Sequence, residues 1–418
     1  MCLTAASASA QERAQSDSTA ITQPPNDTPR HTSDAFRWRQ HPSLRFGDAV
    51  RLEFRARLAI DDRRSDVAFP GSDPASSDVT RERVSVSGVV AKVAEFQIEG
   101  DLGRAAWRDV FANYRQFDRV EVQAGRFKVP FGLDQNTSSS SLDFVYRSRA
   151  ATTLSPGRDR GGMVHGRVTN VRYAVGVFAH DGDNSRGSDV TRVQGNRTLA
   201  GRLTVEPAGS SRSVFEDVQV SVGYTMSDVP EGIADLRGRT QLGETFFAPA
   251  YYVRGARRRV GVDARWRPGP FSLQSEYIRL TSQRLHQGLA GDDLHPLVAS
   301  AWYVSGTWIA TGERKKKGAQ TPKRPLFAGG IGAIEFAARV EAVGFASDGE
   351  GLASTSPRAD TIAVQRDRIA TFGMNWFPNR WIKVQANVVR DVITAPVTSV
   401  FAPPAAYWSR IVRVQLGL

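Results

Sequence analysis

The chain has 418 residues, with 55 Lys and Arg against 43 Asp and Glu, a formal net charge of +12, and 40% hydrophobic residues. That apolar content is enough for a large folded body and excludes a fully disordered chain. A single cysteine excludes a disulfide scaffold and a cysteine-rich metal module. No apolar run reaches the roughly 18 residues of a transmembrane helix. Two classes remain: a soluble β-rich protein, and a transmembrane β-barrel, whose strands escape hydropathy plots.

The first 45 residues divide into two predicted segments. Residues 1–10 contain the small-x-small sequence Ala8-Ser9-Ala10, which is typical of a signal-peptidase site, although the basic n-region is missing. We interpret them as a signal-peptide remnant, with an ordinary frayed terminus as the alternative. Residues 11–45 are rich in Ser, Thr, Gln and Pro and lack periodicity, which predicts a flexible lead-in. Residues 46–418 are expected to form one barrel.

From residue 50 onward, apolar and polar residues alternate, which predicts strands with one apolar face. There are about sixteen runs of up to roughly ten residues, the length with which a tilted strand crosses a bilayer, and bacterial barrels have an even number of strands. The runs lie at 50–58, 83–90, 94–99, 110–114, 120–124, 164–168, 173–177, 199–205, 218–225, 259–266, 271–276, 302–308, 334–341, 370–376, 382–388 and 412–418.

The connections between these runs alternate in length. Short ones are predicted near 91–92, 116–118, 169–170, 268–269 and 378–380, and long ones near 61–80, 130–160, 181–196, 227–257, 281–299, 344–366 and 392–406. Barrels of the outer membrane have short periplasmic turns and long external loops. Two connections break the rule, because 103–106 is short on the external side and 311–330 is long on the periplasmic side.

Alternation alone does not distinguish a barrel from a soluble sandwich, so the aromatic residues help to decide. Trp266, Trp302, Trp308, Trp376, Trp381 and Trp408 lie at strand ends or on the apolar face. In a membrane, such residues form an interfacial girdle. We therefore predict an all-β, 16-stranded antiparallel transmembrane β-barrel in the bacterial outer membrane, with a soluble β-rich binding protein as the less favoured alternative.

Several segments, taken together and in order, resemble the phosphate-selective porin O and P family. They are Gly125–Leu133 (GRFKVPFGL), Pro156–Gly162 (PGRDRGG), Trp302–Trp308 (WYVSGTW), Thr311–Arg314 (TGER), Gly332–Glu335 (GAIE) and Asn375–Asn379 (NWFPN). The resemblance implies a homotrimeric porin, a long loop at 130–160 folded inward as a constriction, and selectivity for anions. Members of the family usually end in an aromatic residue, whereas this sequence ends in Leu418.

Basic residues on the polar faces and in the connections are the candidate anion pathway. Rings of Arg or Lys set anion selectivity in pores, and the guanidinium fork suits phosphate oxygens. The candidates are Arg51, Arg55, Arg57, Lys128, Arg158, Arg160, Arg167, Arg202, Arg237, Arg239, Arg259, Arg265, Lys315, Lys316, Lys317, Arg339 and Lys383. For each, the alternative is a structural one: an arginine can pair with a carboxylate across strands, and the lysine run can be a solvated turn.

The predicted function is passive diffusion of small inorganic anions, phosphate or polyphosphate among them, through a water-filled channel surrounded by outer-membrane lipid. A non-selective channel, or one for another solute, remains open. The six histidines are scattered without metal spacing, and no catalytic or phosphate-cradling motif is present. We therefore expect no cofactor, no metal, no nucleic-acid partner and no enzymatic activity. A barrel hydrolase would need His165 or His180.

Overall fold

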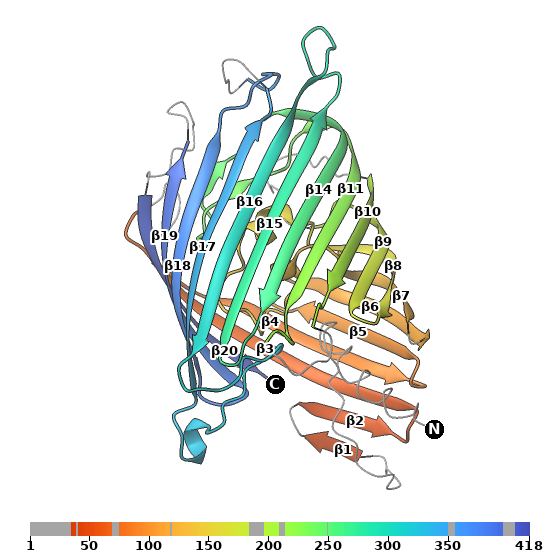
Figure 1. The fold of residues 1–418 in the computed structure, drawn as a ribbon, viewed down its shortest axis with the longest axis vertical. Helices are drawn as coiled ribbons and strands as arrows, with labels where there is room; N and C mark the ends of the chain where they lie inside the picture. Colours follow the sequence, from red (N-terminus) through yellow and green to blue (C-terminus); the bar gives the residue numbers. More distant parts are fainter. Residues whose placement is uncertain are drawn as a thin grey trace.

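The computed structural model describes residues 35–38, 41–68, 75–117, 119–183, 196–208, 214–248, 250–349, 356–395 and 406–418. Within these residues, sixteen strands form one closed antiparallel barrel (Figure 1). They are β3 (Val50–Ser65), β4 (Ala75–Val90), β5 (Ala94–Asp101), β6 (Ala106–Phe117), β7 (Val120–Lys128), β8 (Arg158–Val168), β9 (Val171–His180), β10 (Asn196–Val205), β11 (Gln219–Ile233), β14 (Tyr252–Trp266), β15 (Phe271–Arg284), β16 (Leu294–Ile309), β17 (Ala333–Ser347), β18 (Gln365–Phe377), β19 (Ile382–Thr394) and β20 (Ala406–Gly417).

Closure of the barrel joins β20 to β3. Leu416 lies opposite Leu58 and Val414 opposite Ile60. The Leu418 N–H donates to the carbonyl of Ala56 at 2.9 Å, and the Ala56 N–H donates back at 3.1 Å. A wall closed in this way satisfies its backbone groups laterally, as a hydrocarbon environment requires. The predicted 16-stranded antiparallel barrel is therefore confirmed.

The two faces of the wall are reversed relative to a soluble protein. Ile60, Val177 and Phe372 are 46%, 57% and 61% exposed on the outside, whereas Asp61 and Glu335 are 0% exposed. An exterior with so much exposed apolar surface contacts hydrocarbon rather than water. The predicted orientation of the alternating faces is thus confirmed, and the soluble alternative loses its basis.

A short hairpin precedes the barrel. β1 (Ala35–Trp38) pairs with β2 (Pro42–Phe46), and β2 pairs with the first residues of β3, where Leu44 lies opposite Leu52. β3 begins before its pairing with β20 starts, so β20 leaves the edge of its first residues open, and an open edge offers a template for another strand. Here β2 occupies that edge. The prediction of a flexible lead-in over 11–45 is therefore wrong at its end, because strands of four and five residues are too short to show periodicity. Residues 1–34 lie outside the described residues.

The connections follow the predicted alternation, but most strands extend further than predicted. β3 runs to Ser65 and β4 begins at Ala75, where 61–80 was expected to be a loop, and only 285–293 separates β15 from β16, where 281–299 was expected. Alternation fades where a strand rises above the bilayer, because neither face then has to be apolar. The two predicted exceptions are present, with 102–105 between β5 and β6, and 310–332 between β16 and β17.

Three connections contain structure of their own. The constriction loop (129–157) holds α2 (Leu133–Asn136) and η1 (Ala150–Leu154). The second inner loop (234–251) holds β12 (Gly238–Arg239) and β13 (Thr245–Phe247). The periplasmic segment (310–332) holds η2 (Leu326–Ala328). In the described part of the chain, no helix has the length and apolar character needed to span a membrane.

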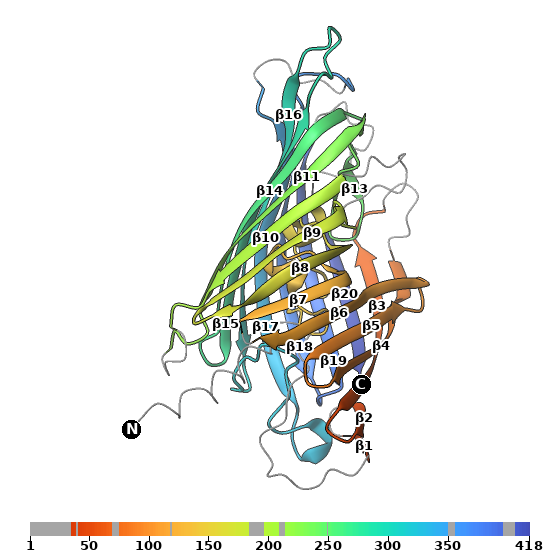
Figure 2. The same cartoon turned by 90° about the vertical axis from the view of Figure 1, so that its right-hand side faces the viewer.

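The wall of the barrel is uneven in height. Strands β14 to β19 have 13 to 16 residues, whereas β5 to β10 have 8 to 12. Figures 1 and 2 show the resulting tall side, formed by β14 to β19, and the low side, formed by β5 to β9. The two sides therefore present different lengths of apolar surface.

Aromatic side chains line the outside of the tall wall at its periplasmic end. The rings of Phe271 and Trp308 are stacked with centroids 6.5 Å apart, and Phe336 continues the row at 6.1 Å from Trp308. Phe215 and Trp266 form a second stacked pair at 5.7 Å. A row of this kind marks a membrane interface. We call these five residues and Trp376 the periplasmic girdle.

Candidate functional site

The constriction loop folds into the barrel and is held by polar side chains of the opposite wall. Its backbone N–H groups donate to carboxylate and amide oxygens on β15, β17 and β19: Leu133 to Glu276 at 3.0 Å, Arg149 to Glu341 at 2.6 Å and Val145 to Asn387 at 2.8 Å. These acceptors lie more than 140 residues away in the chain. The inward-folded long loop predicted at 130–160 is present.

Cationic side chains of the wall hold the same loop by its carbonyl oxygens. Lys383 donates to the carbonyl of Leu142 at 2.5 Å, Arg413 to Val145 at 2.6 Å and Arg339 to Tyr146 at 3.2 Å. Lys128 and Arg259 grip the carbonyls of Thr137 at 3.0 Å and Leu154 at 2.8 Å. Hydrogen bonds from charged donors are among the stronger ones, so much of the positive charge inside the barrel positions this loop.

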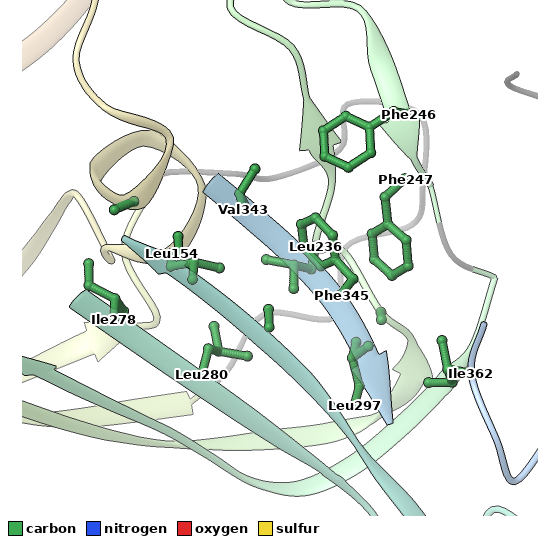
Figure 3. Close-up of a cluster of buried hydrophobic side chains, with 14 of the residues drawn as sticks. Leu154, Leu236, Phe246, Phe247, Ile278, Leu280, Leu297, Val343, Phe345 and Ile362 are labelled. Atoms are coloured by element: carbon green, nitrogen blue, oxygen red, sulfur yellow. The ribbon is translucent and has the colours of Figure 1, made fainter. Parts of the chain in front are cut away.

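An apolar core fills the lumen between the two inner loops and the tall wall (Figure 3). Phe247 of the second inner loop stacks on Phe345 of β17 with ring centroids 4.0 Å apart. Leu154 of the constriction loop and Ile278 and Leu280 of β15 belong to the same cluster, all fully buried. Packing of this density excludes water. The tall side of the lumen is therefore closed at this level.

On its other side, the constriction loop and the neighbouring wall together carry a group of cations, which we call the constriction cluster. It consists of Arg57, Arg81, Arg83, Arg108, Lys128, Arg147 and Arg158. Arg57 and Arg83 converge on the hydroxyl of Ser139 in the loop, at 3.3 and 3.1 Å. Arg81 is close enough to Arg83 and Arg147 to feel the repulsion of both.

Carboxylates neutralise only part of this cluster. Glu99 lies 3.4 Å from Arg108, Asp101 3.0 Å from Arg83, Asp109 2.8 Å from Arg158 and Asp134 3.7 Å from Arg147. Seven cations against four carboxylates leave an excess of three positive charges. Burial, reinforced by the charges of Arg158 and Arg83, lowers the pKa of the Arg147 guanidinium despite the opposing effect of Asp134. The loop thus places a buried cation, which neighbouring arginines repel, toward the low wall.

Comparison with known proteins identifies the fold and the family. Residues 52–392 match the family described as phosphate-selective porin O and P. The chain belongs to this family. Porin O of Pseudomonas aeruginosa is 24% identical over 374 residues, which cover 80% of this chain and 81% of porin O. This family membership confirms the predicted location in the bacterial outer membrane and a channel rather than an enzyme.

Solved porin structures share the architecture of this porin. The anion-selective porin from Comamonas acidovorans has a TM-score of 0.55 at 10% identity, covering 88% of this chain and 100% of that one. The in-vitro folded trimer form of OmpT from Vibrio cholerae has a TM-score of 0.55 at 12% identity, covering 89% and 100%. At these identities the likeness concerns the fold.

The predicted candidates fall into separate groups within this porin. Three of them, Arg57, Lys128 and Arg158, meet in the constriction cluster. Arg51 and Arg55 share Glu53. Six further candidates each form an ion pair: Arg167 with Glu206, Arg202 with Asp263, Arg259 with Asp181, Arg339 with Glu341, Lys315 with Asp143 and Lys317 with Asp217. Arg237, Arg265 and Lys383 donate to backbone or amide oxygens. The side chains of Arg160 and Lys316 are exposed, and that of Arg239 is half-buried.

Four cluster residues, Arg81, Arg83, Arg108 and Arg147, are not among the predicted candidates, and Arg108 and Arg81 show why. Arg108 lies on β6 at a register shift, where Ile98 faces Val110 but Gly100 faces Trp107, so that both Arg108 and Asp109 lie near the inward-facing Glu99 and Arg158. A bulge breaks strict alternation, and its position is not written in the hydrophobic pattern. Arg81 lies in β4 just before the run predicted at 83–90 and after the loop predicted at 61–80. Because Arg81 lies two residues before Arg83, extending the predicted strand would have placed both side chains on its inner face.

Among the described residues, no group of three or more His, Cys, Asp and Glu side chains could hold a metal ion. His180 donates its backbone N–H to Asp159 at 2.7 Å, and His165 lies 3.1 Å from Asn113, so both histidines that a hydrolase would need have local structural partners.

Proposed function

We propose that this porin passes small inorganic anions, phosphate or polyphosphate among them, between the constriction loop and the low wall. The proposal rests on the excess of positive charge in the constriction cluster, whereas several other cations of the lumen are each matched by one carboxylate. Arg202 and Asp263, for example, form a two-pronged pair with both distances at 2.8 Å. Low-dielectric walls concentrate the field of the unbalanced charges along the passage.

The geometry around Ser139 suits an oxyanion. Two guanidinium groups, those of Arg57 and Arg83, already converge on one oxygen atom there. A phosphate oxygen offers the same acceptor with a full charge, and arginine binds such oxygens in pairs. Asp101 pairs with Arg83, and the charges of Glu99 and Asp109 act on Arg57, so these carboxylates weaken the binding of an anion by the two arginines. Conduction requires binding of this moderate kind, since an ion that is held tightly does not leave.

Competition between anions tests the proposal. Chloride current through the purified porin in a planar bilayer is measured while phosphate is added. Phosphate is expected to block the chloride current of the wild type, and the double variant R57Q/R83Q to need at least about tenfold more phosphate, since a loss of 1.4 kcal/mol has that effect. Arg160→Gln, which removes an exposed charge outside the cluster, is the control. Equal block in all three proteins would refute the assignment.

We also propose that the functional unit is a homotrimer with the low wall between copies. β5 has eight residues, and eight residues at about 3.4 Å, tilted by about 40°, span about 21 Å, which is less than the apolar band of about 25 Å. An apolar groove of about 670 Å³ follows the outside of β3 to β6, lined by Phe54, Val84, Val86, Ile98 and Trp107. A second copy placed there would cover both features.

The oligomeric state in detergent tests this arrangement. Trp107→Gln is expected to convert trimers into monomers in light scattering coupled to gel filtration. Trp302→Gln, which removes the same ring from the outside of the tall wall, where Trp302 is 43% exposed, is expected to leave the trimer intact. Trimers that survive the first change as well as the second would contradict the proposed interface.

A further inference from the structure

The periplasmic segment ends in a projecting tip that is both apolar and basic. Phe327 in η2 is 86% exposed and Ile331 is 62% exposed. Lys323 and Arg324 beside them are exposed as well. We call residues 323–331 the periplasmic tip. A surface loop surrounded only by water rarely presents two large apolar side chains next to two cations.

Hydrogen bonds fix this tip beside the periplasmic girdle. The indole N–H of Trp376 donates to the carbonyl of Ile331 at 2.8 Å, and the Leu326 N–H donates to the carbonyl of Pro378 at 2.8 Å. Trp376 lies opposite Ile334, two residues before Phe336 of the girdle. Figure 1 shows η2 at the end of the barrel away from the long loops, projecting beyond the ends of the strands. The tip is therefore continuous with the membrane interface.

The tip itself carries only positive charge, and the nearby carboxylate of Glu313 accepts the Lys323 backbone N–H at 3.1 Å. The sequence of the segment from 314 to 332 and of the turn from 376 to 381 contains no Asp or Glu. Arg380 of that turn adds a third cation, with its guanidinium 5.3 Å from the ring centroid of Trp381. Cations interleaved with aromatic and aliphatic side chains are the chemistry that binds the negative headgroups of a lipid surface while burying an apolar anchor.

We propose that the periplasmic tip inserts into the inner leaflet of the outer membrane and binds anionic phospholipid headgroups. Phe327 and Ile331 enter the interfacial region, and Lys323 and Arg324 pair with headgroup phosphates. A lipid fits better than a periplasmic protein or the cell wall, because the Trp376 hydrogen bond holds Ile331 at the level of the girdle. The proposal does not depend on which solute the channel passes.

A single fluorescent label tests insertion. Because Cys2 is the only cysteine, the variant C2S/F327C takes one environment-sensitive dye, and C2S/A319C and C2S/L289C are matched controls at other exposed positions, Leu289 being 94% exposed in the connection between β15 and β16. Each porin is placed in vesicles of phosphatidylcholine alone or mixed with phosphatidylglycerol. We expect a blue shift and quenching by brominated acyl chains at position 327 only, stronger with phosphatidylglycerol.

Charge reversal tests the headgroup part of the proposal. With the label at 327, the added change K323E/R324E is expected to abolish the difference between the two vesicle compositions, while single-channel conductance shows that the barrel is folded. A label at 327 that is as water-exposed as one at 289 in both vesicles would overturn the proposal. So would a lipid preference that survives the charge reversal, or a signal that changes only when purified peptidoglycan is added.

Discussion

The Nζ atom of Lys315 lies 2.5 Å from a carboxylate oxygen of Asp143 and 2.5 Å from one of Glu335. Asp143 belongs to the constriction loop and Lys315 to the periplasmic segment, so this buried trio joins the periplasmic mouth to the constriction. Gln274 donates to the second oxygen of Asp143 at 3.0 Å. Lys315 was predicted to contact passing anions, but its charge is used to hold the loop.

Removing this lysine is expected to loosen the constriction. In K315Q, Asp143 and Glu335 face each other without their cation, and breaking a buried pair in this way costs about 3 to 5 kcal/mol. We expect a lower thermal unfolding midpoint and a noisier open level in single-channel recordings. K316Q removes the same charge from an exposed neighbour and serves as control. Indistinguishable behaviour of the two variants would show that the trio does not position the loop.

Neutralising one carboxylate of the constriction cluster is expected to strengthen anion binding. Glu99→Gln removes the partner of Arg108 at 3.4 Å and increases the excess positive charge by one. At the effective dielectric of protein sites, the interaction between two charges at contact distance is worth a few kcal/mol. Water in the passage reduces this energy, so we expect phosphate to block the chloride current at about tenfold lower concentration. Asp348→Asn, the same charge change at an exposed external pair with Arg279, should leave the block unchanged. Weaker block in E99Q would count against the cluster.

The constriction loop also depends on a close approach to two glycines. Phe131 is fully buried, and a Cβ atom added at Gly261 or Gly223 would lie 2.9 or 3.0 Å from its ring. Gly261→Val is therefore expected to displace the ring and lower the unfolding midpoint, with overpacking costing about 1 to 3 kcal/mol. Adding Phe131→Leu should recover part of this loss. A double variant less stable than either single variant would contradict the packing argument.

Acid stability should depend on Asp181 in the connection after β9. Burial would raise the pKa of this carboxyl, but Arg259 and Arg257, at 2.5 and 2.7 Å, lower it well below its usual range. Its stabilising contribution is present at neutral pH, begins to fall where an unfolded aspartate would bind its proton, near pH 4, and is lost through the lower folded pKa. Thermal unfolding midpoints between pH 7 and pH 3 should fall more steeply in the wild type than in D181N. Parallel curves would remove Asp181 from the account.

The wall of the barrel was predictable because the alternation of apolar and polar residues within each strand is enough to assign its two faces. Val412, Val414 and Leu416 are 41%, 47% and 40% exposed on the outer face, as their alternation with Arg413 and Gln415 indicates. Contact with lipid imposes this pattern strand by strand, so no long-range partner has to be known.

The interior was not predictable in the same way, because its partners are remote in the sequence. Ile278 and Leu280 face inward although they are apolar, since they pack on loop residues such as Leu154 and Phe246. Arg202 and Asp263 pair across an intervening strand. A polar strand face indicates a lumen. Whether each cation on that face binds a solute or a neighbouring residue depends on which loops fold into the barrel.

The most direct test of the anion pathway is the reversal potential of the wild-type porin in a planar bilayer under a gradient of potassium chloride. The account predicts a wild-type reversal potential with the sign that indicates preference for chloride over potassium. This potential should move toward zero in R57Q/R83Q and stay unaltered in R160Q. A wild-type potential on the potassium side, or one that the two arginines do not affect, would contradict it.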